Sequence, residues 1–218
     1  MQAIMESLFD VIYLSTVTFL GLQMFMGSKQ NTLFRLFGIM TILLGLGDAF
    51  HLIPRMISLW DNGPETYAFS LGLGKLITSV TMTVFYVILY HIWHIYYKVR
   101  NAKIFTYLIH ILAIARIVLL FFPQNDWFNL NASVEWGIYR NIPFALMGLI
   151  ILFLYYRESK ETNDQVFKYM WLAILISFGF YIPVVLWADV YPLVGMLMIP
   201  KTCAYVWVVW MGYKEFKR

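Results

Sequence analysis

The chain has 218 residues, of which 61% are hydrophobic and only 13% are charged, and its mean hydropathy is +0.69. Soluble domains are about 25% charged, so this composition excludes a soluble globular protein and indicates one that crosses a membrane several times. The formal net charge of +4 does not indicate nucleic-acid binding, because the basic residues are spread along expected membrane edges rather than gathered in one patch.

Seven apolar runs are long enough to span a bilayer, for which a helix needs about 20 residues. They cover approximately residues 8–27, 34–56, 67–96, 104–122, 137–156, 167–187 and 192–213. We therefore predict an all-α, polytopic membrane protein, a single domain over residues 1–218 made of seven transmembrane helices. No basic segment precedes the first run, so we expect no signal peptide.

Basic residues mark one side of the predicted bundle. Eleven of the sixteen Lys and Arg fall in the first, third and fifth connections and in the tail: Lys29, Arg35, Lys98, Arg100, Lys103, Arg157, Lys160, Lys168, Lys214, Lys217 and Arg218. Most acidic residues fall in the other connections. The positive-inside rule then places the N-terminus outside and the C-terminus in the cytoplasm. We expect an integral protein of the cell membrane, with lipids as its surroundings.

Short matches recur along the chain at a spacing of about 130 residues. They are Ser28-Lys29 with Ser159-Lys160, Phe37-x-x-Met40 with Phe167-x-x-Met170, and Ile53-Pro54 with Ile182-Pro183. We interpret residues of about 8–96 and 137–213 as two three-helix repeats, joined by a connector helix over about 104–122. Because the connector helix crosses the membrane once, both repeats of this 3+1+3 pseudo-repeat enter the membrane from the same side. The two halves are then parallel and related by a pseudo-twofold axis along the membrane normal. Chance similarity between apolar segments is the alternative.

In this architecture the chain resembles seven-helix proteins such as the sugar-transporting SWEET group and the opsins. The resemblance covers the whole chain but concerns only the number and grouping of helices, because no signature motif of either group is present. It therefore implies a fold and not a function. Gly74-Lys75 is not a phosphate-binding loop either, since the upstream glycine and the preceding strand are missing.

Charged residues lie inside the apolar runs. Lys201 is near the middle of the last run, where a charged amine costs about 2.5–3.5 kcal/mol. Pro200 directly precedes it, and a proline inside a helix removes a backbone donor, so we expect a kink beside the lysine. Asp48, Lys75 and Arg116 lie at similar depths in the second, third and fourth runs.

Asp48 and Lys75 each follow a Gly-Leu-Gly triplet. Small residues let helices approach closely in a bilayer, so we expect the second and third helices to contact each other there and Asp48 to pair with Lys75. Lys201 and Arg116 then have no obvious acidic partner in the core.

Three explanations for this uncompensated charge stay open: an anionic ligand supplies it, Lys201 is neutral or covalently blocked, or an outer acid such as Asp10 or Asp189 reaches in. The first predicts a transporter or ligand-binding protein with an outward-facing polar cavity for a small anionic or polar molecule, and this is the function we expect. The predicted ligand-binding residues are Lys201, Lys75, Asp48, His51, Arg55, Arg116, Arg140, Tyr86, Tyr181 and Tyr205.

Two other function classes fit parts of the pattern. An intramembrane lipid hydrolase would use His51, oriented by Asp48 on the same helix face, to activate water. No nucleophile pattern accompanies them, so we assign no catalytic residue. An opsin-like receptor would carry a chromophore as a Schiff base on Lys201. His91 and His94 lack a nearby carboxylate, so we expect no metal site, and the sequence assigns no cofactor.

Overall fold

The computed structural model describes residues 2–61, 63–129, 132–188 and 190–218. This part contains seven α-helices and two short 3-10 helices: α1 (Gln2–Gly27), α2 (Thr32–Trp60), α3 (Ala68–Tyr96), α4 (Lys103–Leu120), η1 (Pro123–Asn125), α5 (Val134–Glu161), α6 (Met170–Trp187), η2 (Pro192–Leu197) and α7 (Met198–Phe216). Seven of them are long and apolar enough to cross a membrane, the last when α7 is counted together with most of η2. The predicted all-α bundle of seven spans is confirmed.

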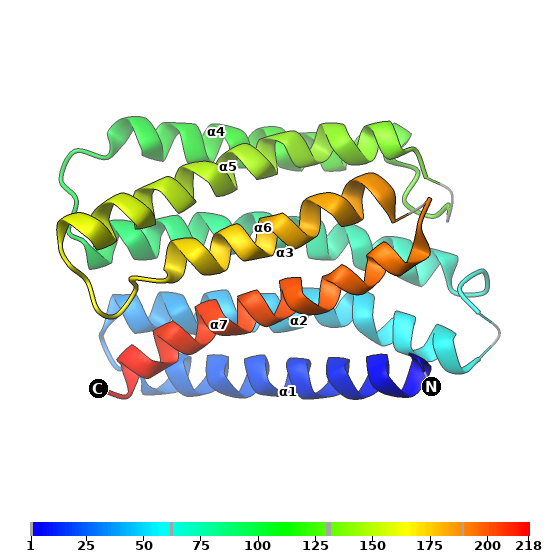
Figure 1. Ribbon diagram of the computed structural model, residues 1–218, viewed down its shortest axis with the longest axis horizontal. Coiled ribbons are helices and arrows are strands. Elements are labelled where there is room, and N and C mark those ends of the chain that lie inside the picture. Colours follow the sequence, from blue (N-terminus) through cyan, green and yellow to red (C-terminus); the bar gives the residue numbers. More distant parts are fainter. Residues whose placement is uncertain (1, 62, 130–131, 189) are drawn as a thin grey trace.

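The helices run along the long axis of the bundle and pack mainly against their neighbours in the chain (Figure 1). α7 also contacts α1 and α2, and α3 contacts α5, so the sequence of helices closes on itself. The N-terminus and the α2–α3, α4–α5 and α6–α7 connections lie at one end, here called the N-terminal end. The C-terminus and the other connections lie at the opposite, C-terminal end.

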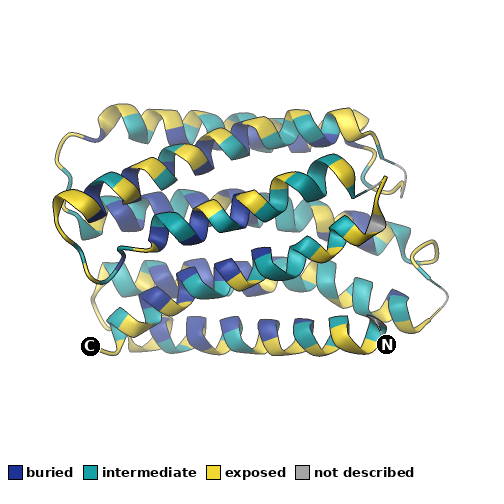
Figure 2. Ribbon diagram, viewed as in Figure 1, coloured by how far each residue is buried: buried dark blue, intermediate teal, exposed yellow. Residues whose placement is uncertain are grey.

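Buried side chains fill the middle and the C-terminal half of the bundle, whereas its outer surface is apolar and exposed (Figure 2). The largest fully buried side chains include Trp93, Tyr90, Tyr155 and Phe167. Exposed apolar side chains such as Ile104, at 73%, cover faces that lipid tails would solvate in a bilayer. The two cavities described below lie in the N-terminal half.

The last glycine of each triplet, Gly47 and Gly74, lies where α2 and α3 pack together. A Cβ on Gly74 would overlap with the backbone of Phe50 and His51, and one on Gly47 would overlap with Thr81. The hydroxyl of Thr78 donates to the carbonyl of Gly47 across the same contact, over 2.8 Å. The predicted close approach of the second and third helices is confirmed, since only glycine leaves room for it.

The start of the last helix differs from the prediction. Pro200 is the third residue of α7, because the preceding residues form η2 rather than α-helix. In the first turn of a helix the missing proline N–H has no intrahelical acceptor to lose. The expected kink beside Lys201 is therefore corrected to a change from 3-10 to α-helix just before it. Pro54, Pro143 and Pro183 lie inside α2, α5 and α6.

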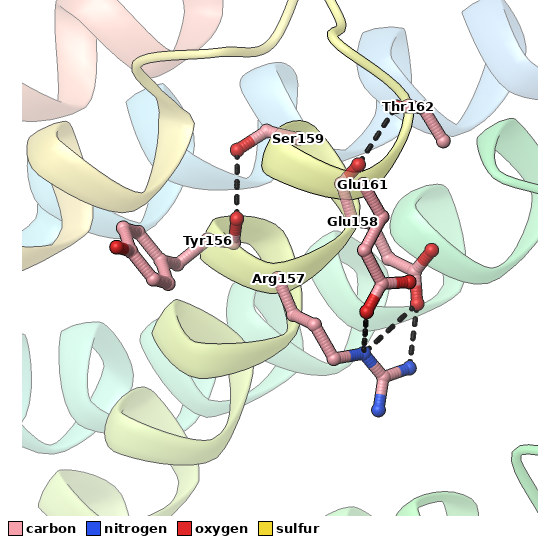
Figure 3. A network of polar contacts seen from close by, with 6 residues as sticks. All are labelled: Tyr156, Arg157, Glu158, Ser159, Glu161 and Thr162. Carbon is pink, nitrogen blue, oxygen red and sulfur yellow. Dashed lines mark hydrogen bonds and ion pairs between the residues drawn. The ribbon is translucent and has the colours of Figure 1, made fainter.

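At the C-terminal end, α5 continues beyond the predicted limit of residue 156 through a polar turn (Figure 3). Arg157 donates to Glu158 through Nη2, over 2.5 Å, and its Nε lies 3.8 Å from Glu161. Thr162 follows the last residue of the helix, and its hydroxyl and backbone N–H both donate to the carbonyl of Glu158. Of these pairs, Arg157–Glu161 has the spacing of one turn at which ion pairs stabilise a helix surface, and it lies beyond the end of the apolar run.

Candidate functional site

A cavity of about 330 Å³ reaches the N-terminal end of the bundle. It is lined by α2, α3, α5, α6 and α7, and also by Arg116 of α4 and by the α4–α5 connection. This volume is at the lower end of the roughly 300–1,000 Å³ of small-molecule sites. We refer to it as the larger cavity.

Five basic residues line the larger cavity: Arg55, Lys75, Arg116, Arg140 and Lys201. They are all the Lys and Arg that are not among the eleven at the C-terminal end of the bundle. No Asp or Glu belongs to the lining within the described part of the chain. The cavity wall therefore carries several positive charges without an acid facing them from the same wall.

Arg116 lies deep in this wall and is 2% exposed. Its Cζ lies over the ring of Phe144, 3.4 Å from the centroid. Its Nε and Nη1 are buried without a hydrogen-bond partner among the described residues. A stacked aromatic ring attracts a cation but accepts no strong hydrogen bond, so two donor nitrogens of Arg116 remain to be satisfied.

Lys201 is 8% exposed and is likewise held by aromatic rings. Its Nζ lies 4.7 Å from the ring centroid of Tyr181 and 5.3 Å from that of Tyr205. The Tyr181 hydroxyl donates to Oδ1 of Asn141 over 2.9 Å, which fixes this ring in the cavity wall. Tyr205 packs edge-on against Phe85 in the core below.

Arg140 stands near the mouth of the cavity and is fixed in place from the α4–α5 connection. Its Nη1 donates to Oδ1 of Asn125 over 2.8 Å, and its Cζ lies 4.2 Å from a ring centroid of Trp127. Asn125 is fully buried and donates in turn to the carbonyls of Leu119 and Phe122 at the end of α4. The guanidinium is oriented, but by a neutral amide and a ring rather than by a carboxylate.

A smaller cavity of about 80 Å³ lies beside the larger one and is lined by three acids, Glu6, Asp10 and Asp48. Oδ2 of Asp48 accepts a hydrogen bond from the Tyr13 hydroxyl over 2.6 Å. Oε2 of Glu6 accepts from Nε and Nη2 of Arg55, over 3.1 and 3.0 Å. Acidic side chains from α1 and α2 thus lie on the side of the site away from α5.

Six residues line both cavities and form the wall between them: His51, Arg55, Thr78, Gly195, Met198 and Lys201. His51 has a buried Nδ1 without a hydrogen-bond partner in the described part of the chain. Lys201 interacts electrostatically with Asp48 on one side and with Arg116 on the other. The wall therefore separates a compartment lined by acids from one lined by cations, and Lys201 lines both.

Three sequence-based expectations need correction here. Asp48 does not pair with Lys75: it accepts from Tyr13, and the cation whose charge acts on it is Lys201. Asp48 therefore does not orient His51 through a hydrogen bond either. Tyr86 is 1% exposed and packs edge-on against the ring of Phe144, beneath the cavity rather than in its lining.

The remaining predicted residues come together. Lys201, Lys75, His51, Arg55, Arg116, Arg140, Tyr181 and Tyr205 all line the larger cavity. One of the open explanations was that an outer acid such as Asp10 reaches into the core. Asp10 does line the smaller cavity, but it does not line the larger one. Asp189 lies outside the described residues.

Sequence reasoning missed several residues of the site. Tyr13 lies one turn from Asp10 on α1, a spacing that signals a shared polar face. Asn141 directly follows Arg140, and both are polar residues at the start of an apolar run. Trp127 and Asn125 come from a connection, where sequence offers no periodicity to place them.

Comparison of the chain with known protein families, with curated proteins and with solved structures finds no match.

Proposed function

We propose that this membrane protein binds a small organic anion in the larger cavity and transports it across the bilayer. The observation that carries the proposal is the cavity wall of Arg55, Lys75, Arg116, Arg140 and Lys201, which contains no described acid. A charged side chain at membrane depth costs about 2.5–3.5 kcal/mol. Glu6 pairs with Arg55, and Asp48 acts on Lys201, whereas Arg116 and Arg140 contact no acid among the described residues, so a bound anion would supply the missing negative charge beside them.

The lining also favours an organic anion over a small inorganic one. Apolar surface lies between the cations and comes from Met82, Trp127, Phe144 and Val184. The volume of about 330 Å³ corresponds to roughly eleven water molecules. The free N–H donors of Arg116 would hold a carboxylate or sulfonate, since charge-assisted hydrogen bonds are the strongest that proteins form.

The orientation of the protein is part of the proposal. The C-terminal end carries eleven of the sixteen basic residues, so the positive-inside rule assigns it to the cytoplasm. The N-terminus and the mouth of the larger cavity then face the outside of the cell membrane. Ligand would enter from there, attracted by Arg140 and Lys75 near the mouth.

Transport further requires the site to open toward the cytoplasm. The 3+1+3 pseudo-repeat offers a route, since one half could rock against the other about the site between them. In this scheme the α1–α7 and α3–α5 contacts are equivalent interfaces between the halves. Pro54 and Pro183, which match in the two repeats, lie inside α2 and α6 and weaken the backbone ladder there.

Thermal unfolding of the purified protein in mild detergent tests the binding. Benzenesulfonate and benzoate are the probes, and a ligand at one hundred times its dissociation constant stabilises a protein by about 2.7 kcal/mol. We expect stabilisation of the natural protein and its loss in Lys201→Met and Lys75→Met. Lys98→Met, which removes a lysine at the C-terminal end, is the matched control. Unchanged stabilisation in both cavity variants would show that the site assignment is wrong.

A second candidate is a receptor with an aldehyde chromophore on Lys201. It is favoured by one observation: the Lys201 amine lies beside a cavity of ligand size and within electrostatic reach of Asp48, which would serve as the counter-ion of a protonated Schiff base. Intact mass under denaturing conditions separates the two functions. A covalent adduct that is lost in Lys201→Met supports the receptor, whereas an unmodified mass with reversible anion binding supports the transporter.

A further inference from the structure

The three acids of the smaller cavity differ in how their charge is stabilised. Glu6 forms an ion pair with Arg55 at 3.0 Å, and Asp48 accepts from Tyr13 at 2.6 Å and interacts with Lys201. Asp10 is only 7% exposed, yet no described side chain hydrogen-bonds to its carboxylate or pairs with it within ion-pair distance. Asp10 is thus a buried, unpartnered carboxyl group in a cavity wall.

The charge of Asp10 nevertheless acts on the groups around it. Its electrostatic neighbours are Arg55, Glu6 and Asp48. Arg55 and Glu6 line the same cavity, and Arg55 also lines the larger one. A change of charge at Asp10 therefore changes the electrostatic potential at Arg55, which lines both cavities.

The ligand that suits this position is a proton. A carboxyl group buried without a hydrogen-bond donor or a counter-ion in contact is stabilised by taking up a proton, because the neutral form avoids the cost of desolvating a charge. A metal cation suits it less, since Lys201 and Arg55 already bring positive charge to the same cavity. The described residues also contain no group of three or more His, Cys, Asp or Glu placed to hold a metal ion.

We propose that Asp10 binds a proton from the N-terminal end of the bundle together with the anion in the larger cavity, so that the protein transports both. The coupling rests on the anion-binding function proposed above, whereas the proton site itself does not. The proton adds to a carboxylate oxygen of Asp10 and leaves from it, and no other bond changes.

The sign of the coupling follows from the charges that face Asp10. The groups that act on Asp10 or line its cavity come from α1 (Glu6 and Tyr13), α2 (Asp48, His51 and Arg55) and α7 (Lys201). One step further away, Lys75 of α3 acts on His51 and Tyr205 of α7 acts on Tyr13. Protonation of Asp10 removes a negative charge beside Arg55 and leaves the basic wall more positive. The anion then binds more tightly at low pH, and by reciprocity a bound anion strengthens proton binding at Asp10.

Infrared difference spectroscopy tests the proton site in the protein without any anion. The carbonyl stretch of a protonated carboxyl group is followed from about pH 4 to about pH 8, a range in which carboxyl groups of proteins titrate. We expect a band that grows as the pH falls, is lost in Asp10→Asn and is kept in Glu135→Gln, an exposed acid at the same end of the bundle. A band that is unchanged in Asp10→Asn overturns the proposal.

Asp10→Glu guards against a folding defect, because it keeps a carboxyl group at this position. We expect it to restore the band with a shifted frequency. A correctly folded Asp10→Glu protein without a titrating band would also overturn the proposal.

Benzenesulfonate affinity, measured at low and neutral pH, tests the coupling, since this anion does not itself titrate. We expect binding to tighten on the order of tenfold as the pH falls, within the range of known couplings, and to be tight and independent of pH in Asp10→Asn. Binding that ignores pH in the natural protein overturns the coupling. Absence of binding at every pH overturns the anion function as well, whereas the infrared band still decides the proton site.

Discussion

The guanidinium of Arg116 lies over the ring of Phe144, with its Cζ 3.4 Å from the ring centroid. This contact joins α4 to α5 and places a cation deep in the bundle without neutralising it. Stacking of this kind contributes about 0.5–2 kcal/mol, which is less than the cost of a charge at this depth. The protein therefore retains an unfavourable charge, as expected of a binding site and not of a structural pair.

Arg116→Met tests this interpretation. Methionine keeps the packing on Phe144 but removes the charge and the unsatisfied donors. We therefore expect the free energy of unfolding of the anion-free protein to rise by about 1–3 kcal/mol, and its unfolding temperature with it. We expect benzenesulfonate affinity to fall at least tenfold. Both are measured by thermal unfolding with and without the anion. Arg100→Met, in the α3–α4 connection, controls for the loss of a positive charge, and a less stable Arg116→Met protein would contradict the account.

Tyr13→Phe removes the hydrogen bond that Asp48 accepts over 2.6 Å. Because hydrogen bonds to charged groups contribute about 1.5–3 kcal/mol, we expect a loss of stability of that size in chemical denaturation. Tyr107→Phe is the matched control, since Tyr107 is 69% exposed on the outer surface of α4. Equal stability of the two variants would mean that Tyr13 does not support Asp48.

Gly74→Ala should disturb the contact between α2 and α3. The added Cβ would overlap with the backbone of Phe50 and His51, which cannot rotate away, so we expect a loss of about 1–3 kcal/mol from overpacking. Gly179→Ala in α6 meets nothing within 4 Å and should leave stability unchanged or raise it slightly. Thermal unfolding of the two variants side by side checks the contrast, and similar effects of both would contradict this packing.

Tyr97 lies just beyond the end of α3, and we expect its titration to lower the stability of the protein at alkaline pH. Burial, and then the hydrogen bond that its hydroxyl donates to Oδ2 of Asp164 over 2.7 Å, raises the pKa of this tyrosine. A pKa that is higher in the folded protein gives stability that is complete below about pH 10, where unfolded tyrosine titrates, and is lost as the pH rises further. We expect unfolding titrations to show this decline in the natural protein.

Tyr97→Phe should remove this part of the decline and lower stability at neutral pH. Tyr156→Phe, an exposed tyrosine on the same end of the bundle, should keep the natural profile. An unchanged alkaline slope in Tyr97→Phe would assign the transition to another group.

The positions of the helices follow from the sequence because the bilayer imposes a minimum apolar length on each span. The predicted ends of the third and sixth spans lie within three residues of α3 and α6. The last span is less predictable, since hydropathy does not separate the 3-10 helix η2 from the α-helix that follows it. α5 continues beyond its apolar run into a polar turn, where Arg157 and Glu161 lie one turn apart and pair.

The sequence indicates which charged residues lie near the larger cavity but not which residues they contact. Depth along each span brings Lys201, Arg116 and Asp48 to one level, because a helix rises by a fixed distance per residue. Rotation about the helix axes decides the pairing, and sequence constrains it weakly. As a result α7, and not α3, supplies the cation near Asp48, and α1 supplies its hydrogen-bond donor.

Crystals of the protein soaked with bromobenzenesulfonate would test the central claim most directly, because the anomalous signal of bromine locates the anion without assumptions about activity. The account predicts a peak inside the larger cavity, with the sulfonate in contact with Arg116 and Lys201 and the ring beside Phe144. Crystals of Lys201→Met should lose this peak. An empty larger cavity, in crystals where the same anion occupies sites among the basic residues of the C-terminal end, would contradict the account.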